Sequence, residues 1–366
     1  MMSDSNRLTT IEHFLRDAGW GKAQFSWLAQ DASTRRYARL KKPDGSTAIL
    51  MDAPPLESLP CTPTMSDAER TKLGWNALTR LAASRVEAFA AVAEHLRKHG
   101  FSAPKVLAGD ASSGLAVIED FGNGLELARL IEGGADETTL YVAAAETLAA
   151  VHAVEIPDTL TGLGRKWPIL QFDRLALQTN ADLFAEWLPK YDQRMSLSDA
   201  DLVVWERERD ALLDMAEAFP RRFTLRDYHA ENLLWLGDRA GKARIGLLDF
   251  QDAVIGWDAW DMAMLVQDAR REVSPEARQA AIAAYLDKTG TNESEFLERL
   301  SIIGTLNALR ITGLFARLIQ RDGKPRYKPF FRRQKALLAA NLAHPSAAGM
   351  QAFIRNRAPF ILEGVA

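Results

Sequence analysis

The chain has 366 residues, of which 47% are hydrophobic and 25% charged, so it can bury a large core and we expect two domains or lobes. Its net charge of −3 argues against a general nucleic-acid binder, because such proteins are usually basic. The single cysteine, Cys61, excludes an intramolecular disulfide framework and a cysteine zinc site.

The N-terminal residues lack a basic start followed by an apolar stretch, which a secretory signal would have. No uncharged apolar run approaches the roughly 20 residues that span a bilayer. We therefore expect a cytoplasmic protein that has neither a membrane nor a nucleic acid as its partner.

The first third of the chain predicts a small antiparallel sheet with one long helix. A helix over 9–20 begins with Thr9 or Thr10 as its cap, and strands follow over 25–30, 37–42 and 47–53. The proline-rich stretch 53–74 is typical of a loop, and 86–99 is predicted to be a helix that Gly100 ends. Two more strands flank the turn 109–114.

Helical patterns dominate after residue 124, apart from one hairpin near residue 240. The sequence therefore predicts an α+β organisation with two lobes. A small antiparallel sheet lobe covers residues 1–120, and a larger, mostly helical lobe covers residues 121–366.

The hairpin carries an unusual group of polar residues. The segment 224–236 reads "TLRDYHAENLLWL", and 243–253 reads "ARIGLLDFQDA". If the two apolar strands pair symmetrically about the turn, residue numbers that face each other sum to about 481, and Asn232 lies opposite Asp249. Cross-strand neighbours have Cβ atoms about 4.5–5.5 Å apart, so this register predicts an amide oxygen beside a carboxylate.

Two hard oxygen ligands of this kind suit Mg²⁺, which completes its shell with water and substrate phosphates. Asp227 lies five residues before Asn232 in the preceding loop and can accept a proton from a substrate hydroxyl. Each residue alone is more often a turn residue, but their order along the chain favours phosphoryl transfer.

These segments resemble the catalytic and metal-binding segments of the aminoglycoside phosphotransferase family, which has a protein-kinase-like fold. The family's His-Gly-Asp is Leu225-Arg226-Asp227 here, so the aspartate is kept and two neighbours differ. The resemblance implies ATP and Mg²⁺ as cofactors, Asp227 as the catalytic base, and Asn232 and Asp249 as the metal ligands.

The N-terminal lobe departs further from the family pattern. Its phosphate-covering turn has no glycine, so the resemblance assigns nucleotide binding to four other residues: Ser33, Thr34, Arg35 and Arg36. The strand that should carry a phosphate-binding lysine has Met51 or Asp52 in that place, and Arg35 or Arg36 would compensate for the lost charge.

The stretch "LAVIEDFG" resembles the hinge between the lobes, which implies adenine contacts from the Glu119 carbonyl and the Phe121 amide. The glutamate that usually supports the lysine from a helix is either Glu87 or Glu94.

Within the family, several segments resemble the bacterial anomeric sugar kinases of cell-wall recycling, among them "AILMDAPP" and "GLLDFQDAVIGWDAW". The resemblance implies a small-molecule amino sugar as substrate, N-acetylmuramate or N-acetylglucosamine, phosphorylated at its anomeric hydroxyl in peptidoglycan recycling. Three residues are candidates for binding the sugar: His229, Glu231 and Asp252. We expect a monomer.

Other residues have two readings each. Trp257 and Trp260 are core aromatics or the wall of a sugar site, and Asp261 is expected to cap the next helix. The basic stretch 310–335 is a solvated face, or it supplies a cation for the lactyl carboxylate of N-acetylmuramate.

Two other functions stay open. The chain could be another small-molecule kinase of this fold, acting on an aminoglycoside, choline or homoserine. The missing lysine also fits a non-catalytic nucleotide-binding protein.

Overall fold

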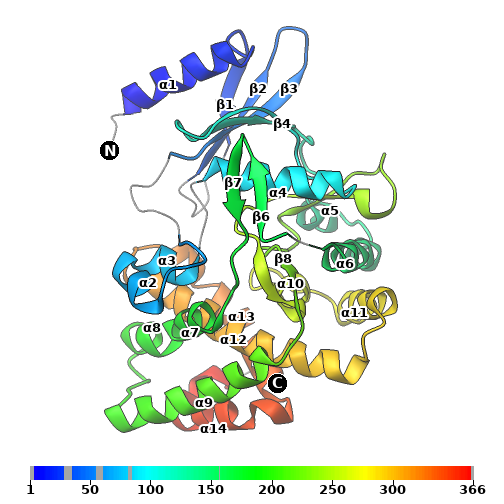
Figure 1. Cartoon of the computed structure of the whole chain (residues 1–366). Helices are drawn as coiled ribbons and strands as arrows, with labels where there is room; N and C mark the ends of the chain where they lie inside the picture. Colours follow the sequence, from blue (N-terminus) through cyan, green and yellow to red (C-terminus); the bar gives the residue numbers. More distant parts are fainter. Residues whose placement is uncertain (1–3, 29–34, 55–60, 81–84, 156, 364–366) are drawn as a thin grey trace.

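The computed structural model of the protein describes residues 4–28, 35–54, 61–80, 85–155 and 157–363 (Figure 1). Two residues predicted to bind the nucleotide, Ser33 and Thr34, lie outside the described residues.

Five antiparallel strands form the sheet near the N-terminus, in the order β1-β2-β3-β5-β4. Their bounds are β1 (Gln24–Trp27), β2 (Arg36–Lys41), β3 (Thr47–Asp52), β4 (Val106–Asp110) and β5 (Leu115–Ile118). All five overlap strands predicted from the sequence.

One helix covers each face of this sheet (Figure 1). Ile11 and Leu15 of α1 (Asp4–Asp17) pack on Leu50 and its neighbours, whereas Phe89 of α4 (Val86–Lys98) packs in the core that contains Met51. Alternate residues of each strand therefore belong to different layers.

Two local predictions in this region are wrong. Helix α1 begins at Asp4 rather than after Thr9 or Thr10, and the Thr10 hydroxyl donates to the Asn6 carbonyl within the helix (3.0 Å). The supposed loop 53–74 contains α2 (Asp67–Leu73), and α3 (Trp75–Thr79) follows. Ser66 and Glu69 form a capping box at the start of α2, a signal that the sequence did contain.

The rest of the chain is mainly helical, as predicted. Its helices are α5 (Leu127–Glu132), α6 (Glu137–His152), α7 (Arg174–Ala181), α8 (Leu183–Tyr191), α9 (Asp199–Glu217), α10 (Asp258–Val266), α11 (Pro275–Thr289), α12 (Glu293–Gln320), α13 (Phe330–Leu342) and α14 (Ala348–Arg357). Short 3₁₀ segments lie at Gly241–Ala243, Pro325–Tyr327, Pro345–Ala347 and Pro359–Ile361.

Three short antiparallel pairs interrupt these helices. They are β6 (Thr159–Gly162) with β7 (Arg165–Pro168), β8 (Arg221–Thr224) with β11 (Val254–Trp257), and β9 (Leu233–Trp235) with β10 (Ile245–Leu247). The sequence predicted only the β9–β10 hairpin. β8 and β11 hold the loops that precede and follow this hairpin, and they bring both loops to one end of α10.

Helix α12 is long and apolar enough to span a membrane by length and composition. However, 72% of its most apolar window is buried inside the fold. It forms the centre of the helical lobe and packs against α8, α10 and α13 (Figure 1).

The described residues do not divide cleanly at residue 120. Arg70 of α2 forms an ion pair with Asp173 at the start of α7 (2.7 Å), so α2 and α3 pack on the helical part (Figure 1). The division into lobes at 120 and 121 stays a prediction.

Candidate active site

The loop Leu225–Asn232 connects β8 to β9 and is anchored by a buried carboxylate of α10. The backbone amides of Leu225 and Arg226 donate to the two oxygens of Asp261 at 2.6 and 2.8 Å. Arg226 adopts a left-handed backbone with φ of 74°. A carboxylate that accepts two backbone N–H groups fixes this turn strongly.

The prediction that Asp261 caps its helix is therefore wrong. Trp257 occupies the N-cap of α10, and no side chain caps that end. Asp261 belongs to the first turn and is fully buried. A carboxylate within the apolar run "AWDMAML" needs buried partners, and this signal was available in the sequence.

The side chain of Asn232 is oriented by the same loop. Its Nδ2 donates to the Asp227 carbonyl at 2.9 Å and lies 3.2 Å from His229 Nε2. Both amide hydrogens are thereby directed into the loop, and Oδ1 is left for another partner. The Asp227 side chain is half-buried, so its carboxylate is accessible to an acceptor.

The hairpin register differs by one residue from the prediction. Leu233 pairs with Leu247 and Leu234 with Gly246, so Asn232 lies opposite Leu248, whose amide donates to the Asn232 carbonyl (2.9 Å). Asp249 follows with a left-handed φ of 57°, which ends the extended strand. Both Asn232 and Asp249 nevertheless line one cavity.

This cavity, of about 480 Å³, lies between the five-stranded sheet and the β9–β10 hairpin. Ile118 and residues 119–123 form one wall, and Tyr37, Arg39 and Ile49 of the sheet line it as well. The Glu119 carbonyl and the Phe121 amide have no backbone partner among the described residues, as adenine contacts would require. The Glu119 carboxylate instead accepts from Lys105 N (3.0 Å), Arg97 and Arg239 (3.2 Å each), so it holds the hinge.

The alternation of side chains on β2 separates the two predicted arginines. Tyr37 and Arg39 line the cavity, and Arg35 lies two residues before Tyr37 on the same side. Its Nη2 contacts Asp249 Oδ1 at 2.6 Å. Arg36 lies on the other side, where it donates to the buried Asp52 (2.7 Å), so we do not retain Arg36 as a nucleotide ligand.

The same alternation places the two candidates for the missing lysine position. Met51 pairs across the sheet with Tyr37, so Met51 is on the layer of the cavity and of α4. Asp52 points to the opposite layer, where Arg7 of α1 also contacts it (2.6 Å). The cavity-side residue at this position is therefore apolar, and Arg35 supplies the positive charge from the neighbouring strand.

Neither candidate for the supporting glutamate contacts a lysine. Glu87 is buried at the start of α4 and pairs with Arg85, and Glu94 is exposed. Phe89 of α4 lines the cavity and stacks on Phe250, with ring centroids 4.9 Å apart. This aromatic contact, rather than an ion pair, joins α4 to the segment that carries Asp249.

Charges around Asp249 keep it ionised. Burial acts to raise the pKa of its carboxyl group, but the Arg35 charge and the Gln251 amide (3.1 Å) outweigh burial and lower that pKa below its ordinary value. Asp252, three residues on, is buried, and burial raises its pKa although Arg226 and Arg35 oppose this.

The remaining candidates for sugar binding differ in exposure. His229 is buried, and its Nε2 faces Asn232, which braces the loop. Glu231 is exposed and lies 3.9 Å from Arg270. Contacts of His229, Glu231 and Asp252 with a sugar stay predictions. Trp257 and Trp260 are fully buried, so the prediction that they are core aromatics is confirmed and they form no sugar wall.

The donor set fits Mg²⁺. Asn232 Oδ1 and the Asp249 carboxylate are hard oxygen ligands on one cavity, and Mg²⁺ typically takes one or two protein groups. Among the described residues, no group of three or more His, Cys, Asp or Glu side chains could hold a metal by itself. A metal bound here would therefore depend on phosphate oxygens and water.

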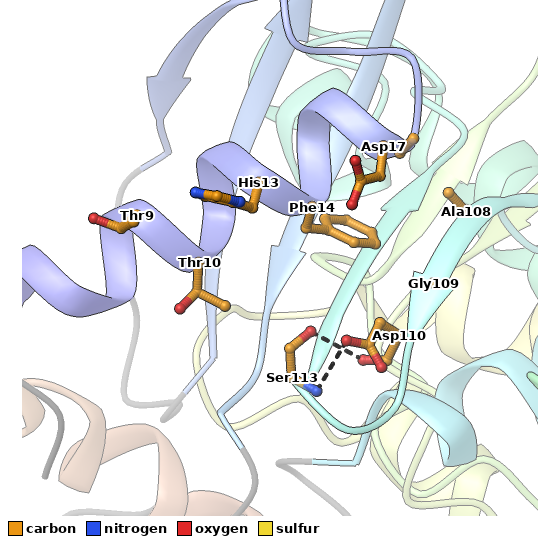
Figure 2. A pocket seen from close by; sticks show the side chains of 10 residues that line it. Thr9, Thr10, His13, Phe14, Asp17, Ala108, Gly109, Asp110 and Ser113 are labelled. Atoms are coloured by element: carbon orange, nitrogen blue, oxygen red, sulfur yellow. Dashed lines mark hydrogen bonds between the residues drawn. The ribbon is translucent and has the colours of Figure 1, made fainter.

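A second hollow, of about 650 Å³, lies between α1 and the turn after β4 (Figure 2). Two acidic residues, Asp17 and Asp110, line it. Asp110 accepts from Ser112 and Ser113, and these hydrogen bonds lower its pKa to about 2. His13 and Phe14 face it from α1 (Figure 2). The residues that line it include none of the predicted catalytic residues.

Sequence comparison agrees with this geometry. Residues 25–297 match the model of the phosphotransferase enzyme family. The chain belongs to this family. This phosphotransferase is 47% identical over 361 residues to the N-acetylmuramate/N-acetylglucosamine kinase of Caulobacter vibrioides, covering 98% of this chain and 99% of the relative. It is 31% identical to the protein of the same name from Pseudomonas aeruginosa, covering 84% and 82% of the two chains.

Solved structures show the same fold. A choline/ethanolamine kinase family protein from Mesorhizobium loti superposes with a TM-score of 0.58 at 17% identity, covering 97% of this phosphotransferase and all of that chain. An ADP-bound aminoglycoside phosphotransferase superposes with a TM-score of 0.52 at 12% identity, covering 92% and 97%. The predicted two-lobed, protein-kinase-like α+β fold is thereby confirmed.

Proposed function

We propose that this phosphotransferase is an ATP-dependent kinase that phosphorylates the anomeric hydroxyl of N-acetylmuramate and N-acetylglucosamine. The observation that carries the proposal is one cavity lined by the hinge, Asn232 and Asp249, beside a loop that presents Asp227. The names of the full-length relatives support the choice of sugar.

In this proposal the adenine binds against the hinge, through the Glu119 carbonyl and the Phe121 amide. Asn232 Oδ1 and the Asp249 carboxylate would hold Mg²⁺, which would neutralise phosphate charge. Arg35 lies at the same end of the cavity, because it contacts Asp249, and it binds the phosphates in place of a lysine.

Asp227 orients the acceptor hydroxyl and takes its proton as the bond from oxygen to the γ-phosphorus forms and the bond to the β-phosphate oxygen of ADP breaks. The anomeric hydroxyl is more acidic than an ordinary alcohol, so an ordinary carboxylate suffices as the base. Asp261 keeps the loop rigid by holding the amides of Leu225 and Arg226.

The proposal extends to the setting of the enzyme. We expect a monomer in the cytoplasm that acts in peptidoglycan recycling and has a small-molecule amino sugar as its partner, with neither nucleic acid nor membrane involved.

The test is to supply the purified protein with Mg-ATP and a panel of amino sugars, amino alcohols and aminoglycosides. ADP release identifies the acceptor, and ³¹P and ¹³C NMR locate the phosphate on the product. We expect turnover with the two sugars and phosphate on C1. Phosphate on C6, or turnover only with choline, homoserine or an aminoglycoside, would overturn the substrate assignment, and no turnover with any acceptor would favour a non-catalytic role.

A further inference from the structure

Arg310 of α12 is a partly buried cation whose hydrogen-bond partners are all neutral. Its Nε donates to Asn307 Oδ1 at 2.9 Å, and its Nη2 lies 3.9 Å from the Met264 sulfur. Its guanidinium stacks 5.4 Å from the centre of the Trp260 ring. No carboxylate of the described residues forms an ion pair with it within 4 Å, although a cation removed from water needs a compensating charge.

Arg310 is one indole ring away from the catalytic loop. Trp260 Nε1 donates to the carbonyl of Arg226 at 3.2 Å, and Arg226 immediately precedes Asp227. Burial lowers the pKa of Arg310 to about 10, and Asp227 opposes that change. The side chain therefore stays charged at neutral pH. The charge of the Asp227 carboxylate favours this protonated form.

Arg270 approaches the same loop from the segment after α10. Its Nη1 lies 3.5 Å from His229 Nε2, and its Nε lies 3.9 Å from a Glu231 oxygen. Its side chain is 35% exposed and that of Glu231 is 44% exposed, so this ion pair is loose and solvated. The Arg270 guanidinium is therefore available to a ligand that enters beside the loop.

We propose that Arg310 and Arg270 form a subsite that binds the carboxylate of an acidic sugar, namely the lactyl carboxylate of N-acetylmuramate. This inference rests on the proposed function, because it assumes that a sugar places its anomeric oxygen at Asp227. The lactyl group is attached to C3, two carbons along the ring from C1, so the carboxylate lies to one side of that oxygen. Asp227 and Arg270 both act electrostatically on Arg310, and Arg270 contacts His229 and Glu231, so the two arginines lie near each other at the loop that carries Asp227.

The charges explain why an acidic acceptor needs this subsite. Without compensation, an anionic sugar that enters beside Asp227 and ATP meets carboxylate and phosphate charges of its own sign. A guanidinium fork matches a carboxylate in geometry and offsets that repulsion. N-acetylglucosamine has no carboxylate, so it gains nothing from the two arginines and serves as the internal control.

The experiment compares three acceptors: N-acetylmuramate, its neutral methyl ester and N-acetylglucosamine. kcat/KM is measured for the wild type, Arg310→Gln and Arg270→Gln. The control variant is Arg317→Gln, on the same helix two turns away, where the guanidinium stacks on Trp75 (4.6 Å) and not on the catalytic loop. Thermal unfolding confirms that each variant is folded.

We expect Arg310→Gln and Arg270→Gln to lower kcat/KM for N-acetylmuramate by roughly tenfold to a hundredfold, the range for a charged hydrogen bond. The same variants should change kcat/KM for N-acetylglucosamine and for the methyl ester only a few-fold. Arg317→Gln should leave the ratio between the sugars unchanged.

Equal losses on all three acceptors would overturn the subsite, because the arginines would then only support the loop. An unchanged ratio between the sugars in both variants would overturn it as well. A wild-type protein that phosphorylates neither sugar would instead refute the proposed function, and the two failures are thereby distinguished.

Discussion

The cavity in which we propose that the nucleotide binds has two walls, and they follow the family pattern to different degrees. The floor, formed by the catalytic loop and the β9–β10 hairpin, keeps Asp227, Asn232 and Asp249 in their expected order. The roof, formed by β2, β3 and α4, has neither the glycine-rich turn nor the lysine, and Arg35 contacts Asp249 instead. In the proposed function the floor supplies specific atoms at fixed positions, whereas the roof supplies only positive charge near the phosphates.

Strand geometry explains how the roof can vary. Side chains of neighbouring strands that pair directly lie on the same layer of a sheet, so a charge can move from one strand to the next and stay in the cavity. A charge cannot move by one position along its own strand, because it would then face α1. Arg36 and Asp52 show that second outcome, since they pair with each other on the α1 side.

The largest effect should come from Asp227, the proposed catalytic base. Asp227→Asn should lower kcat by roughly 10²–10⁴-fold, because the acceptor hydroxyl loses its proton acceptor. ATP affinity, measured by calorimetry, should stay near that of the wild type. If turnover survives this substitution, the role assigned to Asp227 is wrong.

A smaller loss of activity is expected from a change to Asp249, the proposed metal ligand. Asp249→Asn should lower kcat/KM by roughly 10²-fold and raise the Mg²⁺ concentration needed for half-maximal activity, because one anionic ligand is lost. The matched control is Asp238→Asn, an exposed residue of the same hairpin. A Mg²⁺ dependence that is equal in the two variants would contradict the assignment.

The roof is tested by comparing its two arginines. Arg35→Met should weaken ATP and ADP binding by roughly tenfold to a hundredfold, because a charged contact with the phosphates is lost. Its affinity for adenosine should not change.

Arg36→Met is the matched control. It should leave ATP affinity unchanged and lower thermal stability, because the buried Asp52 would keep only Arg7 as its partner. If Arg36→Met weakened ATP binding and Arg35→Met did not, the assignment of Arg35 to the cavity side and Arg36 to the α1 side of the sheet would be wrong.

Asp261, which holds two backbone amides of the catalytic loop, should have a moderate effect on stability. Asp261→Asn should lower the free energy of unfolding by about 1–3 kcal/mol, since an amide NH₂ group replaces one of the two carboxylate oxygens and leaves a buried backbone N–H without an acceptor. Urea unfolding measures this loss, and kcat should fall with it. An unchanged free energy of unfolding would mean that the two amide contacts contribute little.

The smallest effect concerns the contact between α4 and β8, the strand that precedes the catalytic loop. His95 of α4 packs edge-on against Phe223 of β8, with ring centroids 5.8 Å apart. Burial lowers the pKa of His95 from 6.5 to about 4, and His99 and Lys98 act in the same direction. Because the folded-state pKa is depressed, the stability from the neutral ring is present above pH 6.5 and is lost as the pH falls towards 4.

We expect His95→Gln to reduce the loss of unfolding free energy between pH 7 and pH 5 by about 1 kcal/mol, because glutamine does not titrate in this range. Urea unfolding at the two pH values measures the difference. The same pH dependence in both proteins would show that other groups titrate.

Local patterns in the sequence were enough to predict the sheet, the helix α4 and the order of the three floor residues. The predicted hairpin register is one residue off, because an apolar strand pattern alone does not fix the conformation of the turn, and this turn contains a 3₁₀ segment, Gly241–Ala243. The left-handed backbone of Asp249 was also outside the reach of a strand pattern.

Contacts between distant segments could not be predicted in the same way. Asp261 and the loop amides that it holds are 35 and 36 residues apart in sequence, and Arg310 lies against Trp260 only because α12 packs on α10. The basic stretch 310–335 was treated mainly as a solvated face, but Arg310 is partly buried against Trp260 and Met264. Only the packing of the helices places this arginine, among the basic residues of the stretch, against Trp260.

Asp52 has a consequence for how inactive members of such families are recognised. A survey that inspects only the aligned lysine column would find an acidic residue or a methionine here and would class the chain as a pseudokinase. Counting the charges that enter the cavity from all adjacent strands leads to the opposite classification. Degenerate signatures in related chains should therefore be judged by which layer a substituted side chain enters, before catalysis is ruled out.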